Sequence, residues 1–381
     1  MKTHTCVCTV VPPHILHHMA ENPEHRARAL RTLAHTERMR GRREVFAKLL
    51  ASLGTGTKRR TIYDAQHLTT LPGNLVRGET DPPSSDVAVN EAFDYSGATY
   101  DFYQTAYNRN SIDDNGMRLD SSVHYDTNFD NAFWDGQQMV YGDGDQTIFD
   151  RFTKCLDVVG HELTHGVTAA TANLDYQGQS GALNESMSDV FGSLVKQMSL
   201  RQTADKADWL IGAGLFMPGI QGDALRSMSN PGTAYDDPNL GKDPQPADMA
   251  NYVNTSDDNG GVHINSGITN RAFYLVATQI GGNAWEKAGK IWYVTLTQRL
   301  QHDANFQTAA DTTFAVAGEL FGAGGPEQTA VRDGWNGVGI TVNQAGILVS
   351  PGMGKPEGQP AGTPSVGQPP QGKPTPVRRA S

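Results

Sequence analysis

The spacing of apolar residues changes along the chain and divides it into segments of different kinds. Residues 24–53 carry apolar side chains at roughly helical spacing, interrupted at Gly41, which predicts a helical N-terminal leader. Residues 55–150 are rich in Asp, Asn, Gly, Tyr and Thr, with short alternating stretches such as 138–141, and this favours β-strands joined by turns. From residue 157 the spacing becomes helical. We expect helices at 157–170, 181–198, 265–280, 285–300 and 307–321.

These changes predict an α+β protein with two lobes and two appended ends. A leader would occupy residues 1–50, a β-rich lobe residues 51–156 and a mainly helical lobe residues 157–343. A chain of 381 residues is long enough to build two such cores. Residues 344–381 repeat Gly-Gln-Pro and Gly-Lys-Pro with almost no large apolar side chains, so we expect them to be disordered.

The charge is distributed unevenly between the leader and the rest of the chain. Residues 1–60 hold 12 basic and four acidic residues, whereas the remaining 321 hold 19 basic and 37 acidic ones. A basic leader and an acidic body are expected to attract each other within one molecule. The other interpretation of such a leader is a nucleic-acid-binding arm, but Phe46 is its only aromatic residue, so no nucleic-acid partner is predicted.

Cysteine content and hydropathy exclude two further classes of protein. Three cysteines cannot build a disulfide framework, and no run of 18 apolar residues exists to span a membrane. The apolar stretch at residues 6–11 ends at Pro12 and Pro13, too soon for the core of a signal peptide. The chain by itself therefore predicts a cytoplasmic start, with export by another route left open. Six histidines between His4 and His35 match no ligand spacing, which favours a solvated polar face.

The segment His161-Glu162-Leu-Thr-His165 carries the strongest indication of chemistry. On a helix, His161 and His165 lie one turn apart and direct two imidazoles at one point. Glu185, on the next predicted helix, can supply a carboxylate to the same point. Two nitrogens and one oxygen leave a fourth tetrahedral corner for water, which is typical of one catalytic zinc ion. The competing interpretation is a buried amphipathic helix with two structural histidines.

Residues near these three ligands could complete a hydrolytic site. Zinc lowers the pKa of a bound water toward about 7, and Glu162 can take the proton of that water and pass it to a leaving amine. Asp189, four residues after Glu185, could orient a ligand histidine, or could be a plain surface acid. In the segment 257–267, His263 could donate to a developing oxyanion with Asp258 behind it, although a structural histidine is an equal alternative.

Six motifs in order along residues 60–342 resemble the thermolysin family of zinc endopeptidases. These motifs are Asn131-Ala132-Phe-Trp134, Tyr141-Gly-Asp-Gly-Asp145, His161-Glu-Leu-Thr-His165, Asn184-Glu185 with Asp189, Ala224-Leu-Arg226-Ser-Met-Ser, and Asp258-Asn-Gly-Gly-Val-His263. The short leader with Pro12-Pro13 is similar to the compact inhibitory propeptides of the protealysin-type branch. The resemblance implies the two-lobed thermolysin fold, with the zinc helix between the lobes.

The resemblance also implies a role for each matching residue. His161, His165 and Glu185 would bind zinc, Glu162 would be the general base, and His263, Asp258 and Tyr176 would stabilise the transition state. Arg226 would bind a carbonyl on the leaving-group side, and Asn131, Ala132 and Trp134 would hold the peptide as an added strand. A pocket for a large apolar residue after the cut would be lined by Phe149, Phe152, Val158, Ile211, Leu215 and Leu225.

One departure from the family concerns calcium. Asp157 and Asp208 remain of the acidic cluster that would bind it, but Lys196 stands where another acid would be. An ammonium opposes a dication, so calcium binding is doubtful.

The resemblance predicts a secreted monomer that acts on peptides and proteins and is made as a precursor. Its leader would inhibit it until the chain cuts itself, with the apolar run at Leu49-Leu50 as the candidate region, and Cys6 or Cys8 could cap the zinc as a thiolate. An aminopeptidase would need acidic residues to grip a free amine, and no such pattern is present. A leader-capped, non-catalytic peptide-binding protein is the alternative outside enzymes, although a pure binder has no need for Glu162.

Overall fold

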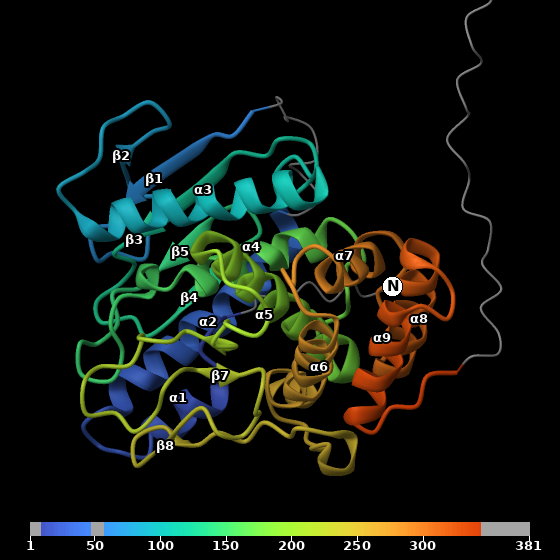
Figure 1. The fold of residues 1–381 in the computed structure, drawn as a ribbon. Helices are drawn as coiled ribbons and strands as arrows, with labels where there is room; N and C mark the ends of the chain where they lie inside the picture. The colour runs from blue at the N-terminus through green and yellow to red at the C-terminus, as the bar shows by residue number, and fades with distance from the viewer. Residues whose placement is uncertain (1–8, 47–56, 344–381) are drawn as a thin grey trace, which may run out of the picture. The chain divides into compact units, whose positions relative to one another are not determined.

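The computed structural model describes residues 9–46 and 57–343. A five-stranded sheet with a long helix across it forms the N-terminal part, and helices α4 to α9 make up most of the rest (Figure 1). The architecture is α+β, as predicted. The predicted tail at 344–381 lies outside the described residues. Within the described part of the chain, no helix is long and apolar enough to cross a membrane.

The leader forms two helices, α1 (Pro13–Met19) and α2 (Arg26–Phe46). Pro13 stands at the first position of α1, where its missing N–H costs nothing and its fixed φ suits a helix. The expected interruption at Gly41 was wrong, because α2 continues through it. A single glycine lowers helix propensity by only about 1 kcal/mol, which does not by itself end a helix.

The sheet has the strand order β2-β1-β3-β5-β4, with β4 at one edge. Parallel pairs join β1 to β3 and β3 to β5, and antiparallel pairs join β1 to β2 and β4 to β5. The strands are β1 (Arg60–Asp64), β2 (Asn74–Arg77), β3 (Leu119–Val123), β4 (Ala132–Trp134) and β5 (Met139–Tyr141). An edge strand exposes unpaired backbone groups to any further strand that approaches it.

The interpretation of residues 55–150 as strands and turns missed one long helix, α3 (Val87–Tyr107), which packs on β1 and β3 (Figure 1). Asp86 caps its N-terminus by accepting from the backbone N–H groups of Ala88 and Val89. Its buried face includes Phe93, Tyr100 and Tyr103 at helical spacing. Aromatic and small polar residues suggested strands here, but burial of this face against the sheet outweighs those weak β preferences.

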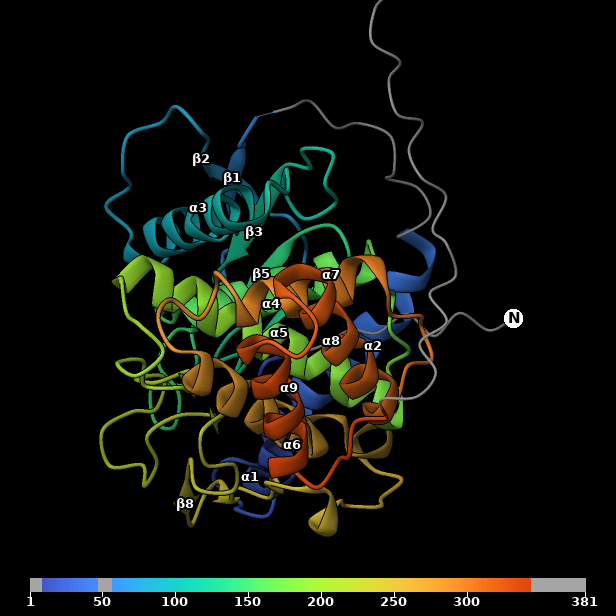
Figure 2. The ribbon, with the colours of Figure 1, turned by 45° about the vertical axis from the view of Figure 1, so that its right-hand side comes forward.

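The helical part contains the predicted helices and one that was not expected. Helix α4 packs against β4 and α5, and α5 packs against α6. Helices α6 to α9 lie on the side away from the sheet (Figures 1 and 2). The helices are α4 (Leu156–Ala169), α5 (Gly178–Leu200), α6 (Asp258–Ile280), α7 (Ala288–Gln298), α8 (Phe306–Phe321) and the unexpected α9 (Pro326–Gly337). Short antiparallel pairs, β6 (Leu210–Ile211) with β7 (Arg226–Ser227) and β8 (Asp236–Asp237) with β9 (Gly241–Lys242), lie between α5 and α6.

Lys196 of α5 links three parts of the helical region. Its Nζ lies 2.7 Å from Asp157 Oδ2 at the start of α4, 2.9 Å from Asp208 Oδ1 and 2.7 Å from the Leu210 carbonyl oxygen. Burial alone would lower the pKa of Lys196, but the Asp157 and Asp208 carboxylates raise it, so the ammonium stays charged. The Lys196 ammonium, a cation of single charge, thus lies among the oxygens that the family resemblance assigns to calcium.

We expect Lys196→Met to destabilise the protein by about 3 kcal/mol, because Asp157 would be left buried without a cation. Thermal unfolding should show the midpoint lowered by roughly 4 °C. Lys206→Met is the matched control, since Lys206 is exposed and pairs only with exposed Asp205. Equal midpoints for the two variants would contradict this account of Lys196.

Candidate active site

Helix α4 directs His161 and His165 to a common point. The helix is almost wholly buried between β4 and α5, and the two Nε2 atoms lie 3.1 Å apart. Glu185 on α5 reaches the same point, with Oε2 3.5 Å from His161 Nε2 and Oε1 3.6 Å from His165 Nε2. All three side chains are buried.

Two glycines allow α4 and α5 to approach closely enough for this arrangement. A Cβ on Gly192 would lie 2.4 Å from the Asp157 carbonyl oxygen, and one on Gly160 would lie 3.1 Å from the Gly192 Cα. Any larger residue at position 192 would push the helices apart. Glu185 would then be withdrawn from the histidines.

Hydrogen bonds at the far side of each ring determine which nitrogen faces the shared point. His161 Nδ1 lies 2.8 Å from Asp189 Oδ1, and His165 Nδ1 lies 2.9 Å from Asn184 Oδ1. Both partners are acceptors, so each Nδ1 carries the proton and each Nε2 presents a lone pair. Two lone pairs and a carboxylate held this close repel one another unless a cation lies between them. The spacing fits Zn²⁺, whose bonds to imidazole nitrogen are about 2.0–2.1 Å long.

A second cluster, His67, His124 and Asp143, also brings three possible metal ligands close together. His124 donates from Nδ1 to Asp143 at 2.9 Å and from Nε2 to Asp86 at 2.8 Å. The hydrogen bond that His124 donates to Asp143 is the largest contribution to its pKa, which is raised to about 9. The ring is therefore an imidazolium near neutral pH and has no lone pair for a metal.

Asp189 connects His161, a predicted metal ligand, to Arg226, a predicted substrate-binding residue. Besides His161, it accepts from Arg226 Nε at 2.8 Å, Arg226 Nη2 at 2.9 Å and Asn270 Nδ2 at 2.8 Å. Burial opposes ionisation of Asp189, but the Arg226 guanidinium and the His161 hydrogen bond hold its pKa well below its usual range. The carboxylate is thus a buried anion that accepts hydrogen bonds from His161, Arg226 and Asn270.

Glu162 follows His161 on α4 and turns toward the sheet. It is fully buried, and its Oε2 accepts a hydrogen bond from the Trp134 backbone N–H at 3.0 Å. Trp134 ends β4, the strand at the edge of the sheet. Glu162 therefore lies between the histidines and the edge strand.

His263 and Tyr176 also lie close to the Glu185 carboxylate. His263 Nδ1 lies 2.7 Å from Asp258 Oδ1, so Nε2 faces Tyr176 Oη at 3.2 Å. The Tyr176 hydroxyl also donates to Glu185. Burial alone would lower the pKa of His263, but the Asp258 and Glu185 carboxylates raise it, which favours an Nε2–H donor. Gly260 between Asp258 and His263 has φ +83°, and a Cβ there would lie 3.0 Å from the Gln177 amide nitrogen.

Residues 9–11 of the leader extend the sheet at β4. Thr9 and Phe133 form an antiparallel bridge, and the Val10 N–H donates to the Ala132 carbonyl at 3.3 Å. The Val11 N–H donates to Asn131 Oδ1 at 2.9 Å. None of the three leader residues is more than 1% exposed. The predicted peptide-binding residues Asn131 and Ala132 thus hold part of the chain itself.

Two carbonyls of this leader segment meet the predicted site residues. The Thr9 oxygen lies 3.2 Å from His263 Nε2, and the Val10 oxygen accepts from Arg226 Nη1 at 2.9 Å. Val10 belongs to the same buried apolar cluster as the six predicted pocket residues. That cluster includes Phe149, Phe152, Val158, Ile211, Leu215 and Leu225.

The leader also binds the catalytic part through charge, as its basic composition predicted. Arg28 of α2 pairs with Asp130 through Nε at 3.0 Å and with Asp145 through Nη2. Both carboxylates are fully buried, and burial raises the pKa of Asp130 to about 8, with the Asp145 charge as the next contribution. Sequence reasoning missed this role for both acids, although Asp130 directly precedes the Asn131 motif and Asp145 ends the motif that begins at Tyr141. Their pairing depends on where α2 docks, which spacing does not show.

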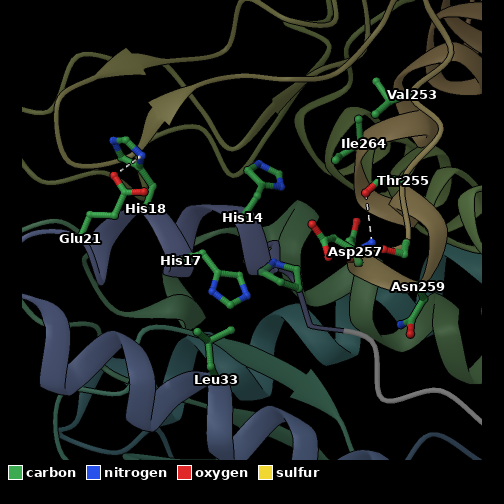
Figure 3. A pocket seen from close by; sticks show the side chains of 13 residues that line it. His14, His17, His18, Glu21, Leu33, Val253, Thr255, Asp257, Asn259 and Ile264 are labelled. Atoms are coloured by element: carbon green, nitrogen blue, oxygen red, sulfur yellow. Dashed lines mark hydrogen bonds and ion pairs between the residues drawn. The ribbon is translucent and has the colours of Figure 1, made fainter.

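The histidines of the leader do not form a solvated face, so that expectation was wrong. Of those described, only His17 is exposed. His14 Nε2 lies 2.8 Å from Tyr235 Oη, and His18 contacts the Pro238 carbonyl oxygen beside β8. Helix α1 and residues 253–264 enclose a pocket of about 610 Å³, in which His14 lies between the two sides (Figure 3). The proposed thiolate cap by Cys6 or Cys8 and the cut near residues 49–50 fall outside the described residues.

Comparisons with known proteins agree with this geometry. Models described as the thermolysin metallopeptidase catalytic domain, its alpha-helical domain and the protealysin propeptide match residues 52–169, 172–340 and 8–44. An extracellular metalloprotease of Pectobacterium carotovorum is 52% identical over 89% of this chain and 98% of its own. Thermolysin of Alicyclobacillus acidocaldarius is 42% identical over 73% and 50%. The solved precursor of protealysin, a metalloproteinase from Serratia proteamaculans, has a TM-score of 0.81 at 55% identity, covering 88% of this chain and 100% of that one.

We expect Asp189→Asn to weaken zinc binding about 10- to 100-fold, because His161 would lose the anionic acceptor that orients its ring. Competition with a chelator of known affinity measures the change. Asp205→Asn, at an exposed carboxylate, is the control and should bind zinc like the unmodified chain. Unchanged zinc affinity in folded Asp189→Asn would refute this role.

We expect docking of the leader to weaken as the pH falls from 6.5 toward 4. Burial lowers the pKa of His14 from 6.5 to about 4 in the docked state, while Asp258 opposes this shift and His263, Arg226 and His17 add to it. A neutral buried imidazole stabilises docking above its free pKa, and that stability is lost as protonation competes. At pH 5 the docking equilibrium should be about 30-fold less favourable than at pH 7.5 through His14 alone.

Hydrogen exchange of the leader amides in catalytically inactive Glu162→Gln measures this loss, after correction for intrinsic exchange rates. His14→Leu should reduce the pH dependence, whereas His17→Leu, at the exposed histidine, should leave it nearly intact. Equal pH dependence in all three chains would show that His14 does not couple docking to pH.

Proposed function

Because the chain belongs to the thermolysin family of metallopeptidases and carries a protealysin propeptide, we propose that its cleft cuts internal peptide bonds before large apolar residues. The chain is a metalloendopeptidase made as a propeptide-bearing precursor. The observation that carries the finer proposal is the leader segment, which lies against the site in the manner of a substrate.

His161, His165 and Glu185 would hold the single zinc ion of this family, which supplies an acidified water and polarises the substrate carbonyl when bound. Glu162 takes the proton from the attacking water and later gives it to the leaving amine. Its position between the histidines and β4 supports this role, because the water would be bound near the histidines and the leaving nitrogen would lie at β4. Asp189 keeps the His161 ring in the required orientation.

Oxyanion stabilisation would come from His263 and Tyr176. His263 Nε2 already lies within hydrogen-bond distance of a carbonyl oxygen, that of Thr9. Asp258 holds the other ring nitrogen, so the donor is oriented before the reaction starts. Removal of such a donor typically costs 10²- to 10³-fold in kcat.

Substrate alignment would depend on β4 and Arg226. Asn131 and Ala132 pair with the peptide backbone, the chain near Trp134 continues the strand, and Arg226 donates to the carbonyl after the cut. The apolar cluster around Phe149 and Leu225 would receive the side chain that follows the cut bond. A charged side chain there would be desolvated without a partner, which disfavours it strongly.

The leader at residues 1–50 would be an intramolecular inhibitor, because it fills the positions that a substrate needs. The lobes at 51–156 and 157–343 would form the catalytic part. Relatives carry the name extracellular metalloprotease, and we extend that location to this chain, which we expect to act as a monomer. Calcium would be unnecessary at the Asp157 site, where the Lys196 ammonium already neutralises the carboxylates. A non-catalytic peptide binder is disfavoured, since Glu162 would be a buried acid without a task.

Glu162→Gln should lower kcat/KM for casein-derived peptides by at least about 10³-fold after the leader has been removed with an added protease. Glutamine preserves the shape and the acceptor for Trp134 but cannot take a proton. Metal analysis should still find one zinc per chain, whereas His165→Ala should lose zinc and activity together. Glu319→Gln, at a half-exposed surface pair, is the control for the substitution itself. Near-normal hydrolysis by Glu162→Gln would overturn the assignment of the base.

A further inference from the structure

The direction in which the leader segment crosses the cleft determines whether it is aligned like a substrate or only blocks access to the site. A chain that crosses an active site backwards presents no bond in reactive alignment. Residues 9–11 run forwards, since the carbonyl that precedes the Thr9–Val10 bond lies at His263 and the one that follows lies at Arg226. These are the donors that the proposed mechanism assigns to the cut carbonyl and to the next one along.

The nitrogen of the same bond is also placed as a leaving group. The Val10 N–H donates to the Ala132 carbonyl oxygen at 3.3 Å, and an amine released there would keep that acceptor. The Val10 side chain follows the bond and is fully buried in the main hydrophobic core, to which the residues of the proposed specificity pocket also belong. Valine is a smaller apolar residue than the pocket would prefer, and this favours slow rather than absent reaction.

We propose that the Thr9–Val10 peptide bond is hydrolysed by the cleft in which it lies, and that this cut leaves the leader docked. The inference rests on the proposed function. Water adds its oxygen to the Thr9 carbonyl carbon, the bond from that carbon to the Val10 nitrogen breaks, and the proton taken by Glu162 passes to that nitrogen. The products are a Thr9 carboxylate and a Val10 amine, with water as the only co-reactant.

Docking survives the cut because the contacts that hold the leader lie after the broken bond. Val10 keeps its carbonyl on Arg226, Val11 keeps Asn131, and Arg28 keeps its two buried carboxylates. Of the carbonyl contacts described above, only the one between Thr9 and His263 belongs to the piece that the cut separates from the docked leader. The Thr9–Val10 cut and activation are therefore separate events, and activation needs a second cut after residue 46.

Time-resolved intact mass and N-terminal sequencing of the purified, zinc-loaded full-length chain test the proposal. We expect chains beginning at Val10 to accumulate at a first-order rate that does not change with protein concentration, while casein hydrolysis stays low. Glu162→Gln should form this end at least 100-fold more slowly. Val10→Asp, which places a charge in the pocket, should also suppress the cut, whereas Val10→Leu should accelerate it.

A mixing arm distinguishes cutting within one molecule from cutting between molecules. Mature active enzyme added to the Glu162→Gln precursor should not produce the Val10 end, because Thr9 and Val10 are buried in their own cleft. Appearance of that end in the mixture at the rate seen for the active precursor would overturn the proposal. So would an intact Thr9–Val10 bond in a precursor that hydrolyses casein once its leader is removed, and the proposed function would then stand. Absence of casein hydrolysis after leader removal would overturn both.

Discussion

One buried carboxylate, that of Asp189, holds together the parts of this molecule that perform chemistry. It orients His161 on α4, forms a two-point pair with Arg226 on β7 and accepts from Asn270 on α6. A buried anion is costly unless its neighbours satisfy it, so these three elements are restrained to one arrangement. The side chains of His161 and Arg226 are therefore positioned by the same carboxylate.

Arg226 divides its hydrogen-bond donors between Asp189 and the leader. Arg226 uses Nε and Nη2 to hold Asp189, which leaves Nη1 for the Val10 carbonyl. The fork of a guanidinium permits such sharing, and a lysine could not replace it. Arg28 makes a comparable contact farther along, between two carboxylates that are fully buried. Removing the leader would leave those acids without a cation, which opposes spontaneous release.

The leader and a substrate would thus bind the same side chains of the cleft. The leader reaches His263, Arg226 and Asn131 by adding a strand to β4, and a substrate would have to do the same. Strand addition at an edge obtains its stability from backbone hydrogen bonds, which any peptide can offer. What distinguishes the leader from an ordinary peptide is the two helices that follow, because they add charge pairing and burial outside the cleft.

Local signals in the chain were sufficient for the zinc helix, for Glu185 and for the helical character of the C-terminal half, because those depend on spacing along single helices. The likeness of six motifs added the two-lobed fold. Helix α3, the positions of the leader histidines and the Arg28 contacts escaped, since they depend on which faces meet after folding. The forward direction of residues 9–11 escaped for the same reason. The sequence of a short extended segment does not show in which direction it will cross a cleft. That direction is determined only when a strand edge, an arginine and a histidine come together around it in the folded chain.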